Sequence, residues 1–407
     1  MPTSAKSKKS AKKIRLRILV IALALTVLQV VIVMMLNEQE TIVTRYSSLA
    51  QWDSVWFMRI ISSGYYVNPS AHNIFYTNTV FPPGFPLLAF IVKSITGLKA
   101  VFSVLLASQI ATFLFWIYFL LLAKRMNVSW FFTAAGVLCV LLYPAAFFFV
   151  VGYSDSLFLA MLLGLVYWQS DGRRYSWLLV GIHGCIMTSA RIVGIPLIIL
   201  PLAYTVFTQG LKGLRDPRPW ITTAVSGTGA GAFYLFCKLV FGEWFLQVRA
   251  HQYWATKPDA GAIFNPIFYR HWIPFYADGV LHPDYFSLMS FQILLSFIIT
   301  AILLELFTLV KRKPSDTSAM RISLYLAALL AWAFTLTARS HNVSSVFRYM
   351  IVPEILCVLG LMGWSSAMRK KKTLPRIVFW VMVIILSAAI PMQIAYIARY
   401  THRLWVA

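Results

Sequence analysis

The sequence has little charge, and acidic charge above all. Only 13 of its 407 residues are Asp or Glu, against 36 Lys or Arg, and charged residues make up 12% of the chain. A soluble domain carries roughly 25% charged residues. Because 59% of the residues are hydrophobic and the mean hydropathy is +0.73, a water-exposed globular surface is excluded for most of the chain.

Cysteine is scarce as well, with four residues in the whole sequence. All four lie in apolar segments and none forms a CxxC pair, which excludes a disulfide framework and a cysteine-based zinc site. The histidines of segment 242–285 match no metal-ligand spacing. We therefore expect neither a metal nor a cofactor.

Apolar segments of about 20 residues recur along the chain, and each could cross the ~30 Å hydrocarbon layer as a helix. The sequence thus predicts an all-α polytopic membrane protein. A basic tail at 1–17 precedes a single transmembrane domain at 18–398, and an outer tail follows at 399–407. The predicted helices, about eleven in number, occupy residues 18–36, 101–123, 130–150, 155–169, 176–188, 193–207, 220–241, 286–310, 321–338, 347–366 and 376–398.

The net charge of +23 lies in short loops between apolar helices and in the N-terminal tail. This distribution is typical of the positive-inside rule and does not indicate a nucleic-acid partner. The apolar run after the tail is too long for a signal peptide and no small-residue cleavage site follows it. We therefore expect a retained first helix with the N-terminus in the cytoplasm.

The segment 176–207 decides the parity of the topology. A single long helix there would move the basic loops 311–313 and 369–372 to the outer side, whereas two short helices keep them inside. We predict a hairpin that turns near 189–194 and places Arg191 in the membrane region or at its outer edge. The long segments on the non-cytoplasmic side are then 37–100, 242–285 and 339–346.

The outer segments contain few acids, and Asp53 is the leading candidate for chemistry. Apolar residues within 51–65 recur at helical spacing and Gly64 can end the helix, which predicts a short amphipathic helix on the outer membrane surface. Asp53 in its first turn is either a helix cap or a catalytic carboxylate. The proline-rich run 81–86, leading into a membrane-skimming helix at 87–99, favours the catalytic role.

Three sequence blocks resemble the PIG-V family of mannosyltransferases, within the GT-C superfamily of membrane glycosyltransferases. Asp155 stands where the family usually has Glu, and Ile192-Val193 stands where it has a polar pair. The resemblance covers about residues 45–200, with the rest similar by layout only. Its motifs are Trp52-Asp53 with Phe57, Ile60 and Gly64-Tyr65, then Phe81-Pro82-Pro83-Gly84-Phe85-Pro86, then Tyr143-Pro144-Ala145-Ala146-Phe147-Phe148, Gly152-Tyr153-Ser154-Asp155-Ser156-Leu157-Phe158 and Ser189-Ala190-Arg191-Ile192-Val193-Gly194.

The resemblance implies a GT-C-like fold with amphipathic helices in the outer loops, a polyprenyl- or dolichyl-phosphate sugar donor, and Asp53 as the catalytic carboxylate. A carboxylate can take the proton of the acceptor hydroxyl while cations stabilise the departing lipid phosphate. One base suffices for an inverting transfer, whereas a retaining double displacement needs a second carboxylate close by.

Two arginines are the candidate phosphate ligands, Arg191 and Arg348. An arginine in a membrane segment normally faces a cavity or a partner, and its planar fork matches phosphate oxygens. The alternative is a structural ion pair with Asp155 or Glu354. Asp155 itself is either a helix-start acid or a second pocket carboxylate.

Aromatic residues crowd segment 242–285, as an interfacial belt or as a platform for the acceptor. If the segment contacts the acceptor, Gln252 and Trp254 are the pair that we expect to do so. The complete set of predicted substrate-binding residues is Trp52, Arg59, Tyr153, Asp155, Arg191, Gln252, Trp254, His341 and Arg348.

The predicted function is a glycosyltransferase, with mannose favoured, that modifies a glycan or glycolipid acceptor at the outer face of a bacterial or archaeal plasma membrane. A transporter or flippase of lipid-linked sugars could use a similar cavity. Such transporters usually show internal pseudo-symmetry, which is not evident here, and keep ionisable groups near the midplane. A ligase or polymerase that joins larger glycans is a third possibility.

Overall fold

The computed structural model describes residues 5–67, 77–253, 276–277, 280–281, 299, 301–303, 305–306, 315–338, 346–367 and 373–403. In these residues the regular structure is helical, apart from one antiparallel pair of two-residue strands, β1 (Tyr276–Ala277) and β2 (Val280–Leu281).

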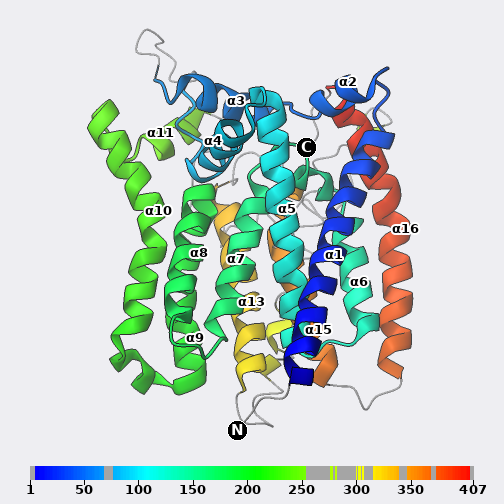
Figure 1. The fold of residues 1–407 in the computed structure, drawn as a ribbon, viewed down its shortest axis with the longest axis vertical. Coiled ribbons are helices and arrows are strands. Elements are labelled where there is room, and N and C mark those ends of the chain that lie inside the picture. The colour runs from blue at the N-terminus through cyan, green and yellow to red at the C-terminus, as the bar shows by residue number, and fades with distance from the viewer. Residues whose placement is uncertain are drawn as a thin grey trace.

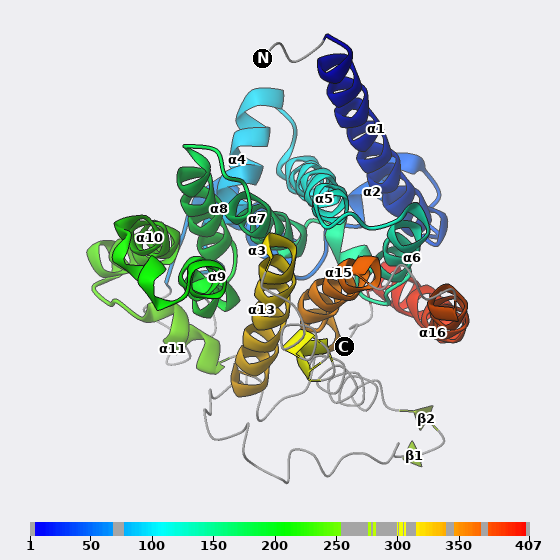
Figure 2. The same ribbon diagram turned by 90° about the horizontal axis from the view of Figure 1, so that it is seen from below.

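The long helices form a bundle along the longest axis of the molecule (Figure 1). Viewed along the bundle, α7 and α15 lie toward the middle while α1, α10 and α16 lie at the edges (Figure 2). The bundle helices are α1 (Ala5–Met35), α5 (Ala100–Arg125), α6 (Trp130–Leu141), α7 (Asp155–Gln169), α8 (Ser176–Ala190), α9 (Leu200–Gln209), α10 (Pro217–Phe241), α13 (Asp316–Ala338), α15 (Ile351–Ala367) and α16 (Thr373–Thr401).

Short helices cross the upper end of the bundle in Figure 1, opposite the N-terminus. They are α2 (Ile42–Ser47), α3 (Asp53–Ser63), α4 (Gly84–Thr96) and α11 (Leu246–Tyr253). Single turns connect or precede the bundle helices. These are η1 (Ala146–Phe149), η2 (Ile192–Gly194), η3 (Pro196–Ile199), η4 (Leu211–Arg215) and α14 (Val346–Tyr349).

Five of the described helical segments are long and apolar enough to span a bilayer, and several shorter apolar helices accompany them. The chain is thus an integral membrane protein. The predicted helix 286–310 falls almost entirely outside the described residues, so the count of eleven remains a prediction. The five segments are 14–35, 100–125, 192–209, 217–241 and 316–335.

Two predicted helices are interrupted by proline. The helix expected over 130–150 ends at Leu141 because Pro144 cannot continue it, and a separate 3-10 turn, η1, follows. The helix expected over 193–207 consists of η2, η3 and α9, with Pro196 and Pro201 at the starts of the last two. The predicted span 193–207 is thus present as one helical segment, 192–209, that begins with 3-10 turns, whereas the predicted span 130–150 is divided after Leu141.

The chain reverses direction at Arg191, whose extended backbone (φ −152°, ψ 143°) ends α8. Gly194 packs directly against the end of that helix, since a Cβ built on it would lie 3.0 Å from the carbonyl oxygen of Met187. Residues seven apart in a straight helix would be about 10 Å apart along its axis. The segment 176–207 is therefore a pair of helices with a tight turn between them.

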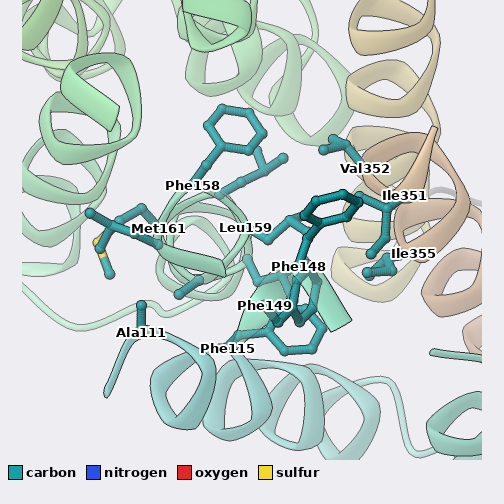
Figure 3. Close-up of a cluster of buried hydrophobic side chains, with 14 of the residues drawn as sticks. Ala111, Phe115, Phe148, Phe149, Phe158, Leu159, Met161, Ile351, Val352 and Ile355 are labelled. Atoms are coloured by element: carbon teal, nitrogen blue, oxygen red, sulfur yellow. The ribbon is translucent and has the colours of Figure 1, made fainter. Parts of the chain in front are cut away.

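The core includes one face of α5, where Phe115, Trp116 and Phe119 are fully buried. Phe115 packs edge-on against Phe149 of η1, with ring centroids 5.0 Å apart. Figure 3 shows this cluster continuing through α7 to Ile351 at the start of α15. Van der Waals packing of this kind stabilises helix association in a bilayer, where lipid is as apolar as the side chains.

Candidate active site

Four charged side chains from four distant parts of the sequence meet at the end of the bundle that carries α3. Asp53 is the first residue of α3, Asp155 the first of α7, Arg191 follows α8, and Arg348 lies in α14. Arg348 donates from Nη1 to Asp53 Oδ2 at 2.7 Å and from Nη2 to Asp155 Oδ2 at 2.8 Å. Arg191 Nη1 pairs with the other oxygen of Asp155. We call these four residues the Asp–Arg cluster.

The four side chains of the cluster differ in their exposure to solvent. The side chain of Asp155 is 0% exposed, those of Arg348 and Arg191 are 8% and 12% exposed, and that of Asp53 is 22% exposed. Both oxygens of Asp155 are held by arginines, which satisfies a buried carboxylate. Asp53 is therefore the member of the cluster that a substrate can reach most readily.

Asp53 is held in place by its neighbours on both sides. Trp52, just before it, has φ +52°, a left-handed conformation that is strained for an aromatic residue. Ser54, just after it, donates its buried hydroxyl to the carbonyl oxygens of Val151 at 2.8 Å and Gly152 at 3.1 Å. The start of α3 is thereby tied to the loop that precedes Asp155.

That loop is held from α5 by buried hydroxyl groups. Ser108 accepts a hydrogen bond from the Gly152 amide at 3.0 Å, and its own carbonyl accepts from the Ser156 hydroxyl at 3.1 Å. Gly152 has φ +83°, and a Cβ there would lie 2.9 Å from Ser54 Oγ. Glycine is thus required both by the backbone conformation and by the close approach of Ser54.

Aromatic rings cover the arginines. The guanidinium carbon of Arg348 lies 4.2 Å from the ring centre of Tyr153 and 4.9 Å from that of Phe148. The guanidinium of Arg191 lies 5.2 Å from the ring of Tyr349. Rings over guanidinium groups add cation–π attraction and reduce contact with water, so charges in the cluster interact strongly.

Five of the predicted site residues thus come together: Tyr153 contacts the Asp–Arg cluster, and the other four form it. Trp52 adjoins it through the backbone of Asp53. Arg59 is exposed on α3 and stacks on Trp56, 5.1 Å from its ring centre, rather than on the cluster. The backbone of Gln252 lies in α11, whereas its side chain, Trp254 and His341 lie outside the described residues.

The sequence analysis assigned no site role to Ser54, Ser108 or Phe148, although Phe148 ends one of the motifs that it singled out. Ser54 adjoins Asp53 in the sequence, but its hydrogen-bond partners are nearly 100 residues away, and no local pattern reveals them. In the described part of the chain, no group of three or more His, Cys, Asp or Glu side chains could hold a metal.

A family model described as Mannosyltransferase (PIG-V) matches residues 20–248. No curated protein matches the sequence significantly. The apo oligosaccharyltransferase of Archaeoglobus fulgidus has a similar fold, with a TM-score of 0.52 and 13% identity over 97% of this chain and 56% of that chain.

Two further solved structures are similar. AglB from Archaeoglobus fulgidus, in complex with an inhibitory peptide and a dolichol-phosphate, gives a TM-score of 0.50 and 14% identity over 96% of this chain and 56% of that chain. ArnT from Cupriavidus metallidurans, bound to undecaprenyl phosphate, gives a TM-score of 0.49 and 14% identity over 95% of this chain and 76% of that chain. This chain spans little more than half the length of the archaeal oligosaccharyltransferases.

Proposed function

The chain belongs to the PIG-V mannosyltransferase family and is a membrane glycosyltransferase; from this premise we propose that it transfers mannose from a polyprenyl- or dolichyl-phosphate donor to a glycolipid or other membrane-associated acceptor. The observation that carries the proposal is the Asp–Arg cluster, in which a partly exposed carboxylate, Asp53, lies 2.7 Å from a buried guanidinium, Arg348. This pairing supplies a base and a phosphate ligand at one point.

In the proposed reaction Asp53 takes the proton of the acceptor hydroxyl as its oxygen attacks the anomeric carbon. The bond between that carbon and the lipid phosphate breaks, and Arg348 and Arg191 stabilise the charge that develops on the phosphate. Asp155 is an unsuitable nucleophile, because it is fully buried and both its oxygens are paired with arginines. A single accessible carboxylate supports an inverting transfer.

The lipid-phosphate donor is supported by family membership and by the similarly folded AglB, whose structure holds a dolichol-phosphate. The acceptor approaches from the end of the bundle that carries α3 and Asp53. We place this end on the non-cytoplasmic face of a bacterial or archaeal plasma membrane, since the basic tail of α1 lies at the opposite end (Figure 1).

Turnover by the purified protein tests the proposal. Wild-type protein in detergent or liposomes should release lipid phosphate from polyprenyl-phosphate mannose when extracted membrane glycolipids are supplied as acceptors. The Asp53→Asn variant should lose roughly 100-fold or more of this activity, because loss of a general base costs 10²- to 10⁴-fold.

Asp53→Asn should melt close to the wild-type temperature, because a partly exposed carboxylate contributes little to packing. Normal transfer by this variant would exclude Asp53 as the base. Movement of the intact donor across a liposome membrane without its cleavage would instead favour a flippase.

A further inference from the structure

The charges of the Asp–Arg cluster cancel. Two aspartates face two arginines, and the nitrogens of Arg348 are divided between the acids, with Nη1 on Asp53 and both Nη2 and Nε on Asp155. A lipid phosphate entering this site would therefore meet no uncompensated cation within the cluster. One of the ion pairs has to open before a guanidinium of the cluster can bind the phosphate without a competing carboxylate.

The pair that opens at least cost is that of Arg348 with Asp53. Asp155 is fully buried, and separating it from its arginines would leave a charge unpaired in a water-poor environment. Asp53 is 22% exposed and joins Arg348 through one hydrogen bond, so water or a neutralising proton can replace that contact. Asp155 thus fixes the position of Arg348, and Asp53 is its exchangeable partner.

We propose that Asp53 and the lipid phosphate compete for Arg348, so that protonation of Asp53 during transfer releases this guanidinium to the departing phosphate. This inference rests on the proposed function. It adds that Arg348 pairs first with the base, Asp53, and then with the leaving group, the lipid phosphate.

The step balances in charge and in atoms. The proton of the acceptor hydroxyl moves to Asp53, the acceptor oxygen bonds to the anomeric carbon, and the electron pair of the broken carbon–oxygen bond stays on the phosphate. Asp53 loses one negative charge as the phosphate gains one. Arg348 faces both events, so its interaction energy is transferred from one anion to the other as the reaction proceeds.

Asp53→Asn imitates the protonated base, and this gives a test that does not require turnover. Undecaprenyl phosphate is titrated into the purified wild type and into Asp53→Asn at one fixed pH, which keeps the charge of the phosphate constant. The variant should bind the lipid about tenfold more tightly, because Arg348 no longer has a competing anion. Adding Arg348→Lys to Asp53→Asn should remove most of the gain.

Asp171→Asn is the matched control. Asp171 also pairs with two arginines, Arg125 at 3.4 Å and Arg173 at 2.5 Å, but, whereas Asp155 is the first residue of α7, Asp171 follows the last residue of that helix. Its substitution changes the net charge equally and should leave the affinity for undecaprenyl phosphate unchanged. An equal gain in both variants would reduce the effect to overall charge and overturn the inference.

Equal or weaker binding by Asp53→Asn would also overturn it. If the wild type still transfers sugar from its lipid phosphate in that case, the proposed function stands and only the competition for Arg348 fails. If no form of the protein binds undecaprenyl phosphate and the wild type transfers nothing, both proposals fail.

Discussion

Arg191 and Arg348 have different contact partners in the cluster. Arg191 pairs with Asp155 and lies beneath the ring of Tyr349, and among the described residues no ion pair joins it to Asp53. Pairing with Asp155 agrees with the structural alternative raised from the sequence, and it is equally compatible with a phosphate ligand whose position is fixed by a buried acid. The two roles make different predictions for a conservative substitution.

Arg191→Lys keeps the charge but loses the planar fork, so a phosphate ligand at this position should lose about tenfold or more in affinity for a polyprenyl-phosphate donor. Combination with Arg348→Lys should cost less than the sum of the two single changes, because both groups act on one phosphate. Donor binding and thermal unfolding should be measured on the same preparation. Lower stability with unchanged donor affinity would leave Arg191 with a purely structural role.

Ser54 is the residue through which the two acidic segments are joined. Its hydroxyl holds the carbonyls of Val151 and Gly152, and its backbone is bonded to Asp53. Ser54→Ala should therefore lower kcat roughly tenfold by displacing the base, with little change in the KM for the donor.

Ser365→Ala is the control for the loss of a buried serine hydroxyl, since Ser365 donates to the Met362 carbonyl of its own helix. It should leave kcat unchanged. If Ser54→Ala and Ser365→Ala lower the melting temperature alike and neither alters kcat, Ser54 has no role in positioning Asp53.

At the scale of the elements, α8 and α10 pack closely together at positions occupied by glycine. A Cβ at Gly229 of α10 would lie 1.9 Å from the carbonyl oxygen of Cys185, and one at Gly184 of α8 would lie 2.0 Å from Ser226 Oγ. Small residues permit this approach in a membrane, where close packing and polar contacts replace the hydrophobic effect. The hairpin that carries Arg191 is thus anchored by backbone contact with α10.

Gly229→Ala should destabilise the protein by about 1–3 kcal/mol, because the helices have to separate to admit the methyl group. Gly231→Ala on the same helix is a close control: beyond its own stretch of helix, no described residue has an atom within 4 Å of its Cβ position, so it should be neutral or slightly stabilising. Thermal unfolding in one detergent compares them. Equal stability of the two variants would show that the α8–α10 contact is looser than described.

For the whole molecule, the end of α16 lies on the same side as the Asp–Arg cluster. Tyr400 donates to the Leu49 carbonyl at 2.8 Å, and His402 lies 3.3 Å from Glu38. The N-terminal end of α1 lies at the opposite end of the bundle (Figure 1). An odd number of crossings would produce this arrangement.

A tag at the C-terminus should therefore react with a membrane-impermeant reagent added from the non-cytoplasmic side, and a tag at the N-terminus should react only after the membrane is permeabilised. Reaction of both tags from the same side would indicate an even number of crossings and would overturn the predicted topology.

The sequence by itself determined that the protein lies in a membrane, that its fold is helical, and which residues are candidates for catalysis and binding. Hydropathy can be read from each segment by itself. Because lipid offers no hydrogen-bond partners, apolar spanning segments of this length satisfy their backbone groups as helices. The scarcity of acids in the outer segments, together with the motifs around Asp53, Asp155 and Arg191, was enough to select the candidates. The amphipathic helix with Asp53 in its first turn was likewise predicted and is present as α3.

The tertiary structure alone decided how these residues are paired. Asp53 and Arg348 are 295 positions apart, and Asp155 and Arg348 are 193 apart. Nothing local distinguishes the carboxylate that both arginines bury from the one left partly exposed. That difference arises because α7 begins inside the bundle while α3 lies across its end, and it gives the two acids their different roles in the proposed reaction.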